Sequence, residues 1–235
     1  MQRRFSNLVT RRLRFPSVYH KITTEKAITK YLVWLVKTDD DFEETGKYNK
    51  ADFHNMLEQQ YSLLNRNVHK KHARDIEDVV NIGMLKTSQL QKQLWSIENY
   101  NATRAWSFGM IPVINIIKAG TGMSDNVSIM ENENSDIDTA TKAGKINDWF
   151  SVERERMEKN SIGLNLVAGI KHSLDIDWKE ANNLVLDQIT QDIHSNDFLK
   201  DIVLWHATEK RYMCKSIPIP AYKREQIDKL VANNV

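Results

Sequence analysis

The chain has 235 residues, of which 41% are hydrophobic and 27% are charged, so its composition excludes an intrinsically disordered protein. Its net charge of +2 is unevenly distributed, because six basic side chains and no acidic ones lie in residues 1–24. The other 27 basic side chains are outnumbered by 31 acidic ones, which excludes the broad cationic surface that sequence-independent binding to nucleic acid needs.

Residues 1–22 form a basic amphipathic segment. Four arginines share one side of a helical wheel, and apolar side chains occupy the opposite side: Phe5, Leu8, Val9 and Leu13. An arginine-rich amphipathic segment without acids is typical of a mitochondrial presequence. We therefore predict targeting to the mitochondrial matrix, with two alternatives: a retained basic arm that lies on a partner or on nucleic acid, and an ordinary surface helix. The candidate partner-binding residues are Arg3, Arg4, Arg11, Arg12 and Arg14.

Residues 23–118 are predicted to be an N-terminal helical region. Thr23 or Thr24 can cap a helix over residues 25–37, which is followed by an acidic, polar stretch that ends at Gly46. Asn49 starts a second helix, in which apolar side chains recur with helical spacing at Phe53, Leu57, Tyr61, Leu64 and Val68. The pattern resumes after residue 76, so residues 49–98 are predicted to be one very long helix or a helical hairpin.

Residues 119–144 differ in kind from the rest of the chain. Between Lys118 and Lys142 the sequence has five acids and no base, with several Asn and Ser residues and glycines near both ends. We predict an acidic loop or linker here, which is the best candidate for a domain boundary.

Residues 145–235 are predicted to be a C-terminal helical region. Its first helix covers residues 145–159, with four side chains inward: Ile146, Trp149, Phe150 and Met157. Asp177 and Glu180 form a capping-box-like start for the next helix. That helix is expected to bury Trp178, Ala181, Leu184, Val185, Ile189 and Ile193. A further helix covers residues 195–210, and a short terminal helix follows Pro220.

The sequence has few signs of catalysis. His69 and His72 have a metal-like spacing, but lysines and an arginine flank them, which is typical of a solvated face. His206 and Cys214 could form a nucleophile pair, although a lone cysteine is more often a packed side chain. Phosphate-binding, dinucleotide-binding and zinc-hydrolase motifs are absent from the sequence. We therefore predict no enzyme activity, no metal and no cofactor, and we keep an enzyme built on one of these two pairs as an alternative.

Cysteine usage and hydropathy bear on the compartment. Cys214 is the single cysteine, which excludes an intrachain disulfide and is typical of a reducing compartment. The most apolar stretch, residues 105–120, is shorter than a membrane-spanning helix and contains Pro112 and Asn115. We therefore expect no membrane span.

These observations predict an all-α protein of roughly six to eight helices, with a long helix or hairpin in the N-terminal half and a helical bundle in the C-terminal half. The predicted function is that of a non-enzymatic structural or accessory subunit of a large macromolecular assembly. The predicted location of this assembly is the mitochondrion. Its predicted partners are other protein subunits, and any nucleic-acid contact is confined to the N-terminal arm. The alternative is a virion connector or neck protein that retains its basic arm.

Overall fold

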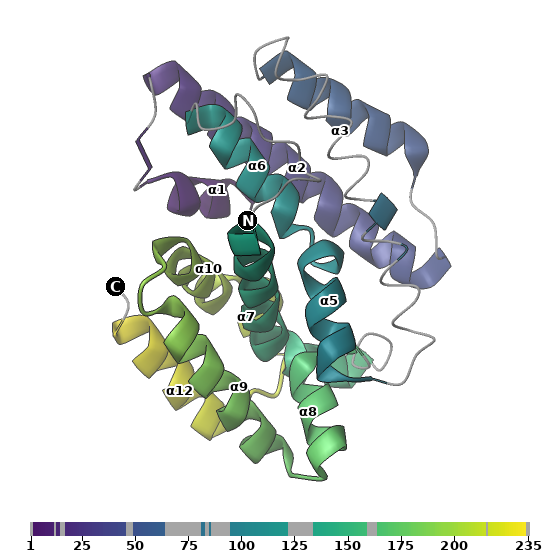
Figure 1. Ribbon diagram of the computed structural model, residues 1–235, viewed down its shortest axis with the longest axis vertical. Helices are drawn as coiled ribbons and strands as arrows, with labels where there is room; N and C mark the ends of the chain where they lie inside the picture. The colour runs from purple at the N-terminus through teal and green to yellow at the C-terminus, as the bar shows by residue number, and fades with distance from the viewer. Residues whose placement is uncertain are drawn as a thin grey trace. The chain divides into compact units, whose positions relative to one another are not determined.

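A computed structural model describes residues 2–11, 13–14, 17–45, 49–63, 81–82, 85, 95–121, 134–158, 164–214 and 216–233. Within these ranges every regular element is a helix, which confirms the predicted all-α class (Figure 1). The helices of these ranges are more numerous than the predicted six to eight, because stretches such as Leu166–Leu174 and Lys210–Met213, to which no separate helix had been assigned, are helical as well. None of them combines the length and the apolarity that crossing a bilayer requires.

The chain divides into two compact units, each made of two separate stretches of sequence. Unit 1 comprises Met1–Ser88 and Ala105–Ala140, and unit 2 comprises Gln89–Arg104 and Thr141–Val235. Neither unit is therefore a continuous half of the chain.

Unit 1 is organised around α2 (Val18–Thr45). Three helices pack against it: α1 (Gln2–Thr10), α3 (Lys50–Leu63) and α6 (Met110–Thr121). Tyr31 lies in the core, where its hydroxyl donates a hydrogen bond of 3.0 Å to the carbonyl of Gly109. The Trp34 ring lies 5.1 Å from the ring of Phe53, centroid to centroid, and joins α2 to α3.

The start of α2 differs from the predicted one. The helix begins at Val18, and the Ser17 hydroxyl accepts a hydrogen bond of 3.3 Å from the backbone N–H of His20. Thr23 and Thr24 lie inside the helix and donate to carbonyls one turn earlier, at 2.9 and 2.8 Å. The prediction was wrong because a threonine hydroxyl can be satisfied by the preceding turn as well as by a free N–H at a helix end. At its other end α2 continues to Thr45, through the stretch that was predicted to be an acidic loop.

The predicted start of α3 at Asn49 is confirmed. The Asn49 side chain accepts from the backbone N–H groups of Ala51 and Asp52, at 3.0 and 3.3 Å, and so caps the helix. Phe53 and Met56 are buried. The part of the predicted long helix or hairpin that follows Leu63 lies almost wholly outside the described residues, as do Leu64 and Val68.

Unit 2 contains most of α7 (Asn134–Glu158) and the N-terminal part of α5 (Ile97–Ser107). The other helices of this unit are α8 (Leu166–Leu174), α9 (Trp178–Ile193), α10 (Asp197–Thr208), the single turn α11 (Lys210–Met213) and α12 (Ala221–Ala232). Short polar side chains start three of them in the expected way, since Asn165, Asp177 and Asn196 each accept a backbone N–H at a helix start.

The predicted boundary segment, residues 119–144, overlaps two helices. Helix α6 extends to Thr121 and α7 begins at Asn134, while residues 122–133 lie outside the described ranges. The acidic Asp136 in the first turn of α7 favours a helix start, and Ala140 and Ala143 are buried in the helix. Acidic residues near a helix start thus resemble a linker when only their composition is considered.

Three inward positions were predicted wrongly, and one of them, Trp178, is half-buried. Met157 is 54% exposed and Leu184 is 39% exposed, whereas Ile146, Trp149, Phe150 and Val185 are buried as expected. Met157 lies in the last turn of α7, beyond the packed part of the helix. Asn182 is fully buried on α9, where its backbone carbonyl accepts a hydrogen bond of 3.1 Å from the Trp149 indole.

The contact of α8 with Trp95 leads to a testable prediction. A Cβ atom on Gly169 would lie 1.9 Å from Cε2 of the Trp95 indole. We expect Gly169→Ala to lower the free energy of unfolding by about 1–3 kcal/mol in urea titrations, even though alanine favours helices. Adding Trp95→Ala should recover part of this loss, because it removes the clashing ring. Strictly additive effects of the two substitutions would contradict the contact.

Candidate functional site: a basic face and a buried ionic cluster

Helix α1 is held against α2 by its apolar and hydroxyl side chains. Phe5 and Val9 are buried, with 1% and 3% of their surface exposed. The hydroxyls of Ser6 and Thr29 are 2.7 Å apart, and the Thr10 hydroxyl donates to Oε1 of Glu25 at 2.9 Å. These contacts run antiparallel along the two helices and join the first ten residues to the core of unit 1.

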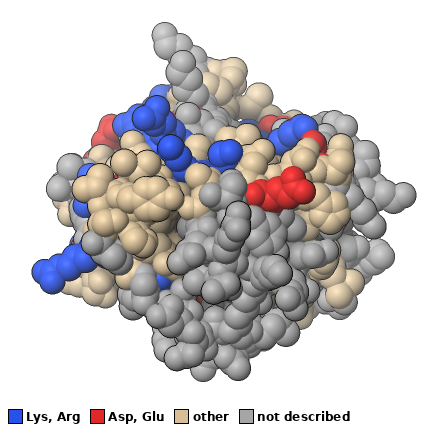
Figure 2. Space-filling view, turned by 90° about the horizontal axis from the view of Figure 1, so that it is seen from above, with Lys and Arg blue, Asp and Glu red and all other residues tan. Residues whose placement is uncertain are grey.

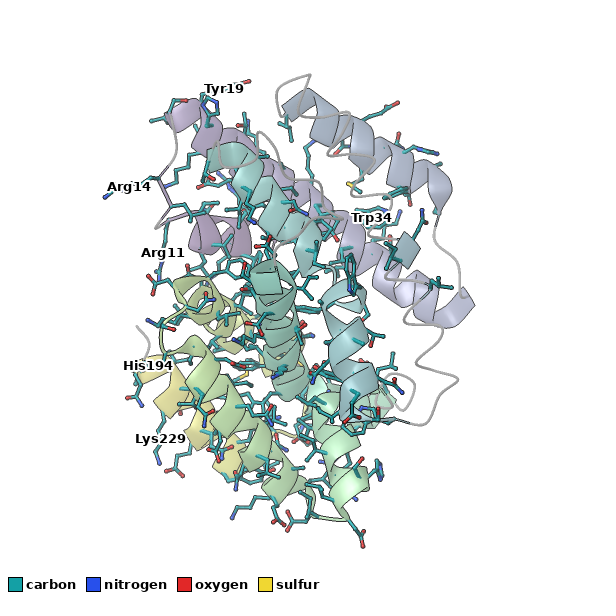
Figure 3. The ribbon with its side chains drawn as sticks, in the orientation of Figure 1. Arg11, Arg14, Tyr19, Trp34, His194 and Lys229 are labelled. Atoms are coloured by element: carbon teal, nitrogen blue, oxygen red, sulfur yellow. The ribbon has the colours of Figure 1, made fainter. Side chains whose placement is uncertain are left out.

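The arginines of this region lie on the solvent side. We call the exposed set the basic face, and its residues are Arg3, Arg4, Arg11 and Arg14. Because α1 ends at Thr10, the last two of them belong to the connection between α1 and α2, not to one helical wheel as predicted. Figure 3 labels both in this connection, where the Arg14 side chain points away from the helices. Arg12 lies outside the described residues.

A second group of polar residues lies in the interior of unit 2, where Arg104 is half-buried and the others are buried. We call it the ionic cluster, and its residues are Tyr100, Arg104, Asp148, Glu155 and Asn165. Asp148 is its centre. The carboxylate of Asp148 pairs with the Arg104 guanidinium and accepts from the Tyr100 hydroxyl at 2.8 Å.

Asp148 also fixes the start of α8. Its Oδ2 atom accepts from the backbone N–H of Leu166 at 3.0 Å, one of the groups that a helix start leaves without an intrahelical partner. The Asn165 amide donates to the Asp148 carbonyl and to Oε2 of Glu155, both at 2.8 Å. The cluster thus joins α5, α7 and α8.

Burial changes the acidity of the two carboxyl groups. Desolvation raises the pKa of Asp148, and the neighbouring Arg104 opposes the rise. Desolvation, together with repulsion from Asp148, raises the pKa of Glu155 to about 7. Since Asp148 is only 2% exposed, its carboxylate is closed to a substrate and serves to hold helices together.

Lys223 on α12 is buried as well. It is 1% exposed, and its Nζ donates a hydrogen bond of 2.5 Å to the Trp149 carbonyl and lies 3.8 Å from Oε1 of Glu153. The Nζ atom is also 5.0 Å from the centroid of the Trp149 ring. Desolvation lowers the pKa of Lys223 to about 7, and the attraction of Glu153 opposes the shift. This contact attaches α12 to α7.

Of the four residues predicted as alternatives for catalysis, His206 and Cys214 have described positions. His206 is fully buried, and its Nδ1 lies 2.9 Å from the Ile202 carbonyl. Cys214 has its Sγ 2.9 Å from the Ser216 hydroxyl, a contact that lowers the pKa of the thiol. His69 and His72 lie outside the described residues. Among the residues with a described position, no group of three or more His, Cys, Asp or Glu side chains is arranged to hold a metal ion.

The sequence reasoning missed the ionic cluster. One signal was present, because Asp148 and Glu155 are seven residues apart and so share one face of a helix with the apolar Val152. Their partners Arg104 and Asn165 come from distant parts of the chain, and no local pattern brings them together. Comparisons of the chain with protein-family models, with curated proteins and with solved structures each gave no match.

Proposed function

We propose that this chain is a non-enzymatic structural or accessory subunit of a larger assembly, and that α1 remains part of the working protein. The proposed location is the mitochondrial matrix, on the composition of residues 1–22. One observation carries the proposal: α1 buries Phe5 and Val9 in unit 1 while the basic face is exposed. A segment that contributes to a core is suited to stay with the fold and to present its arginines to a partner.

The buried charges of unit 2 support a structural role. Asp148 and Lys223 are inaccessible to solvent, and each connects helices that are distant in the sequence. Networks of this kind fix one arrangement of helices, and removing one partner is costly because the other charge stays buried. A fixed arrangement of helices in unit 2 is suited to a structural role, and the exposed arginines of unit 1 are suited to binding another macromolecule.

The proposal is tested by isolating the chain from its native cell with a small tag and measuring its native mass and its N-terminus. We expect a complex much heavier than the 27.4 kDa chain, with the residues of α1 still present in the recovered protein. A recombinant variant with Arg3→Glu and Arg4→Glu, added to an extract depleted of the native chain, should fail to rebuild the complex. The matched control is Lys179→Glu with Arg224→Glu, which makes the same charge change at exposed positions of unit 2. A monomeric native chain would contradict the proposal.

The second candidate is a virion connector with a retained basic arm. The packing of α1 on α2 favours it equally, because such a protein keeps its N-terminal arm. The two candidates differ in native mass. A connector should assemble into closed rings of identical copies, whereas an accessory subunit should be recovered with different partner chains at a defined stoichiometry.

A further inference from the structure

The first turn of α2 exposes apolar side chains to an unusual degree. Val18 is 75% exposed, Tyr19 69% and Ile22 44%. The first two are the most exposed large hydrophobic side chains among the described residues. We call these three residues the apolar tip. Three neighbouring apolar side chains without a covering element indicate a contact surface more strongly than one isolated exposed residue does.

The apolar tip adjoins the basic face. Val18 follows Arg14 by four residues, and the connection that contains Arg11 and Arg14 leads directly into the first turn of α2. Figure 3 labels Tyr19 at this end of α2 and Arg14 lower on the connection, toward α1. Figure 2 shows Lys and Arg side chains on the face of the molecule seen from above, among uncharged side chains and some Asp and Glu side chains.

Residues 1–24 carry six basic side chains and no acidic one. Glu25 is the first acidic residue of the chain, and its Oε1 accepts from the Thr10 hydroxyl. The described residues of this segment therefore combine exposed cations with protruding aliphatic and aromatic groups. An anionic bilayer matches both properties, because negatively charged headgroups lie directly above an apolar layer.

We propose that the basic face and the apolar tip together form a docking surface for an anionic phospholipid membrane. Arginines contact the headgroups, and Val18, Tyr19 and Ile22 enter the interfacial layer, where a tyrosine ring is well placed with its hydroxyl toward water. Nucleic acid fits this surface less well, since it offers no apolar layer to Val18 and Ile22. A membrane also receives protruding side chains without the matching pocket that a protein partner would need.

The inference rests on the part of the proposed function that keeps α1 in the working protein. Its test uses the full 235-residue chain and vesicles of phosphatidylcholine with phosphatidylglycerol, or of phosphatidylcholine alone, in flotation assays. Because no partner chain is present, the result is independent of whether the native protein is found in a complex. We expect binding to the anionic vesicles that weakens with added salt, and little binding to the neutral ones.

Three variants separate the contribution of the arginines to vesicle binding from that of the apolar tip. Arg11→Glu with Arg14→Glu should weaken binding to anionic vesicles at least tenfold, since each cation near such a surface contributes favourably and each acid repels. Val18→Ser with Tyr19→Ser should weaken it several-fold by removing insertion. Tyr19→Leu should retain binding within about twofold, because leucine inserts as well, whereas a surface that stacks nucleotide bases would lose affinity.

The matched controls are Lys179→Glu with Arg224→Glu for charge and Leu174→Ser for apolar exposure, all at exposed positions of unit 2. They should leave vesicle binding unchanged, and helical circular dichroism should be the same in all variants. Equal binding to neutral vesicles, absence of binding to anionic ones, or binding that Val18→Ser with Tyr19→Ser leaves intact would overturn the proposal. Tight binding to single-stranded RNA or to an acidic protein in place of vesicles would overturn it too.

Discussion

Replacing Asp148 with alanine is expected to lower the free energy of unfolding by about 3–5 kcal/mol, the largest effect of any substitution considered for this protein. The substitution removes the carboxylate that pairs with the guanidinium of Arg104, whose side chain is only 14% exposed. It also removes the acceptor of the Tyr100 hydroxyl and of the Leu166 N–H, and each unsatisfied buried group adds its own desolvation cost. Urea unfolding followed by circular dichroism measures the loss.

Two further variants make this prediction specific. Asp148→Asn keeps the shape and one acceptor oxygen, so it should lose less stability than the alanine variant but still lack the charge. Asp187→Ala removes an exposed carboxylate from α9 and should change the free energy of unfolding by at most about 0.5 kcal/mol. An Asp148→Ala protein as stable as the Asp187→Ala protein would show that the ionic cluster does not hold α5, α7 and α8 together.

Lys223 is expected to make the stability of the protein increase with pH. Its pKa is about 7 in the folded protein and near its ordinary value of 10.5 in the unfolded chain. Between these two values the unfolded chain binds a proton that the folded protein releases, so raising the pH favours folding. The expected gain between about pH 7 and pH 10 is about 3 kcal/mol. The charged neighbours of the amine are Glu153, Glu155 and Arg156, and none of them reverses the direction.

Lys223→Met isolates this effect. Methionine keeps an unbranched side chain against Trp149 but cannot titrate, so the rise in stability should disappear, measured by urea unfolding at several pH values. At neutral pH the variant should be as stable as the unchanged protein within about 1 kcal/mol, or more stable, because an apolar isostere avoids the desolvation of a buried cation. Lys229→Met, at a side chain 70% exposed, should leave the pH dependence intact. An unchanged slope in the Lys223→Met protein would contradict the assignment.

Much of the fold could be predicted from the sequence because helical periodicity is a local property. The apolar spacing identified Ile146, Trp149 and Phe150 as buried, and Asp177 started a helix as expected. The helix bounds were predicted wrongly where several hydroxyl or acidic residues could each start or end a helix. Thr23 and Thr24 show this most clearly, since a helix interior satisfies them as well as a cap would.

The buried polar groups could not be predicted, for a different reason. Whether a carboxylate such as Asp148 is buried depends on partners that only the tertiary fold brings near. Arg104 lies 44 residues away in the sequence and Leu166 lies 18 residues away. A charged residue is assigned to the surface by default. The exceptions are stabilised by contacts with residues that are far away in the sequence. The same limit applies to Lys223, whose partner Trp149 lies 74 residues away in the sequence.

The interleaving of the two units has a consequence for synthesis on the ribosome. Helix α12 is among the last parts of the chain to be made, and Lys223 joins it to α7 across 74 residues. Unit 2 also draws on Gln89–Arg104, which is made well before Thr141–Val235. Tyr100 and Arg104 are therefore translated before their partner Asp148, and α12 is translated later still. Vectorial synthesis thus makes the middle of this chain the segment most dependent on chaperone protection while translation is under way.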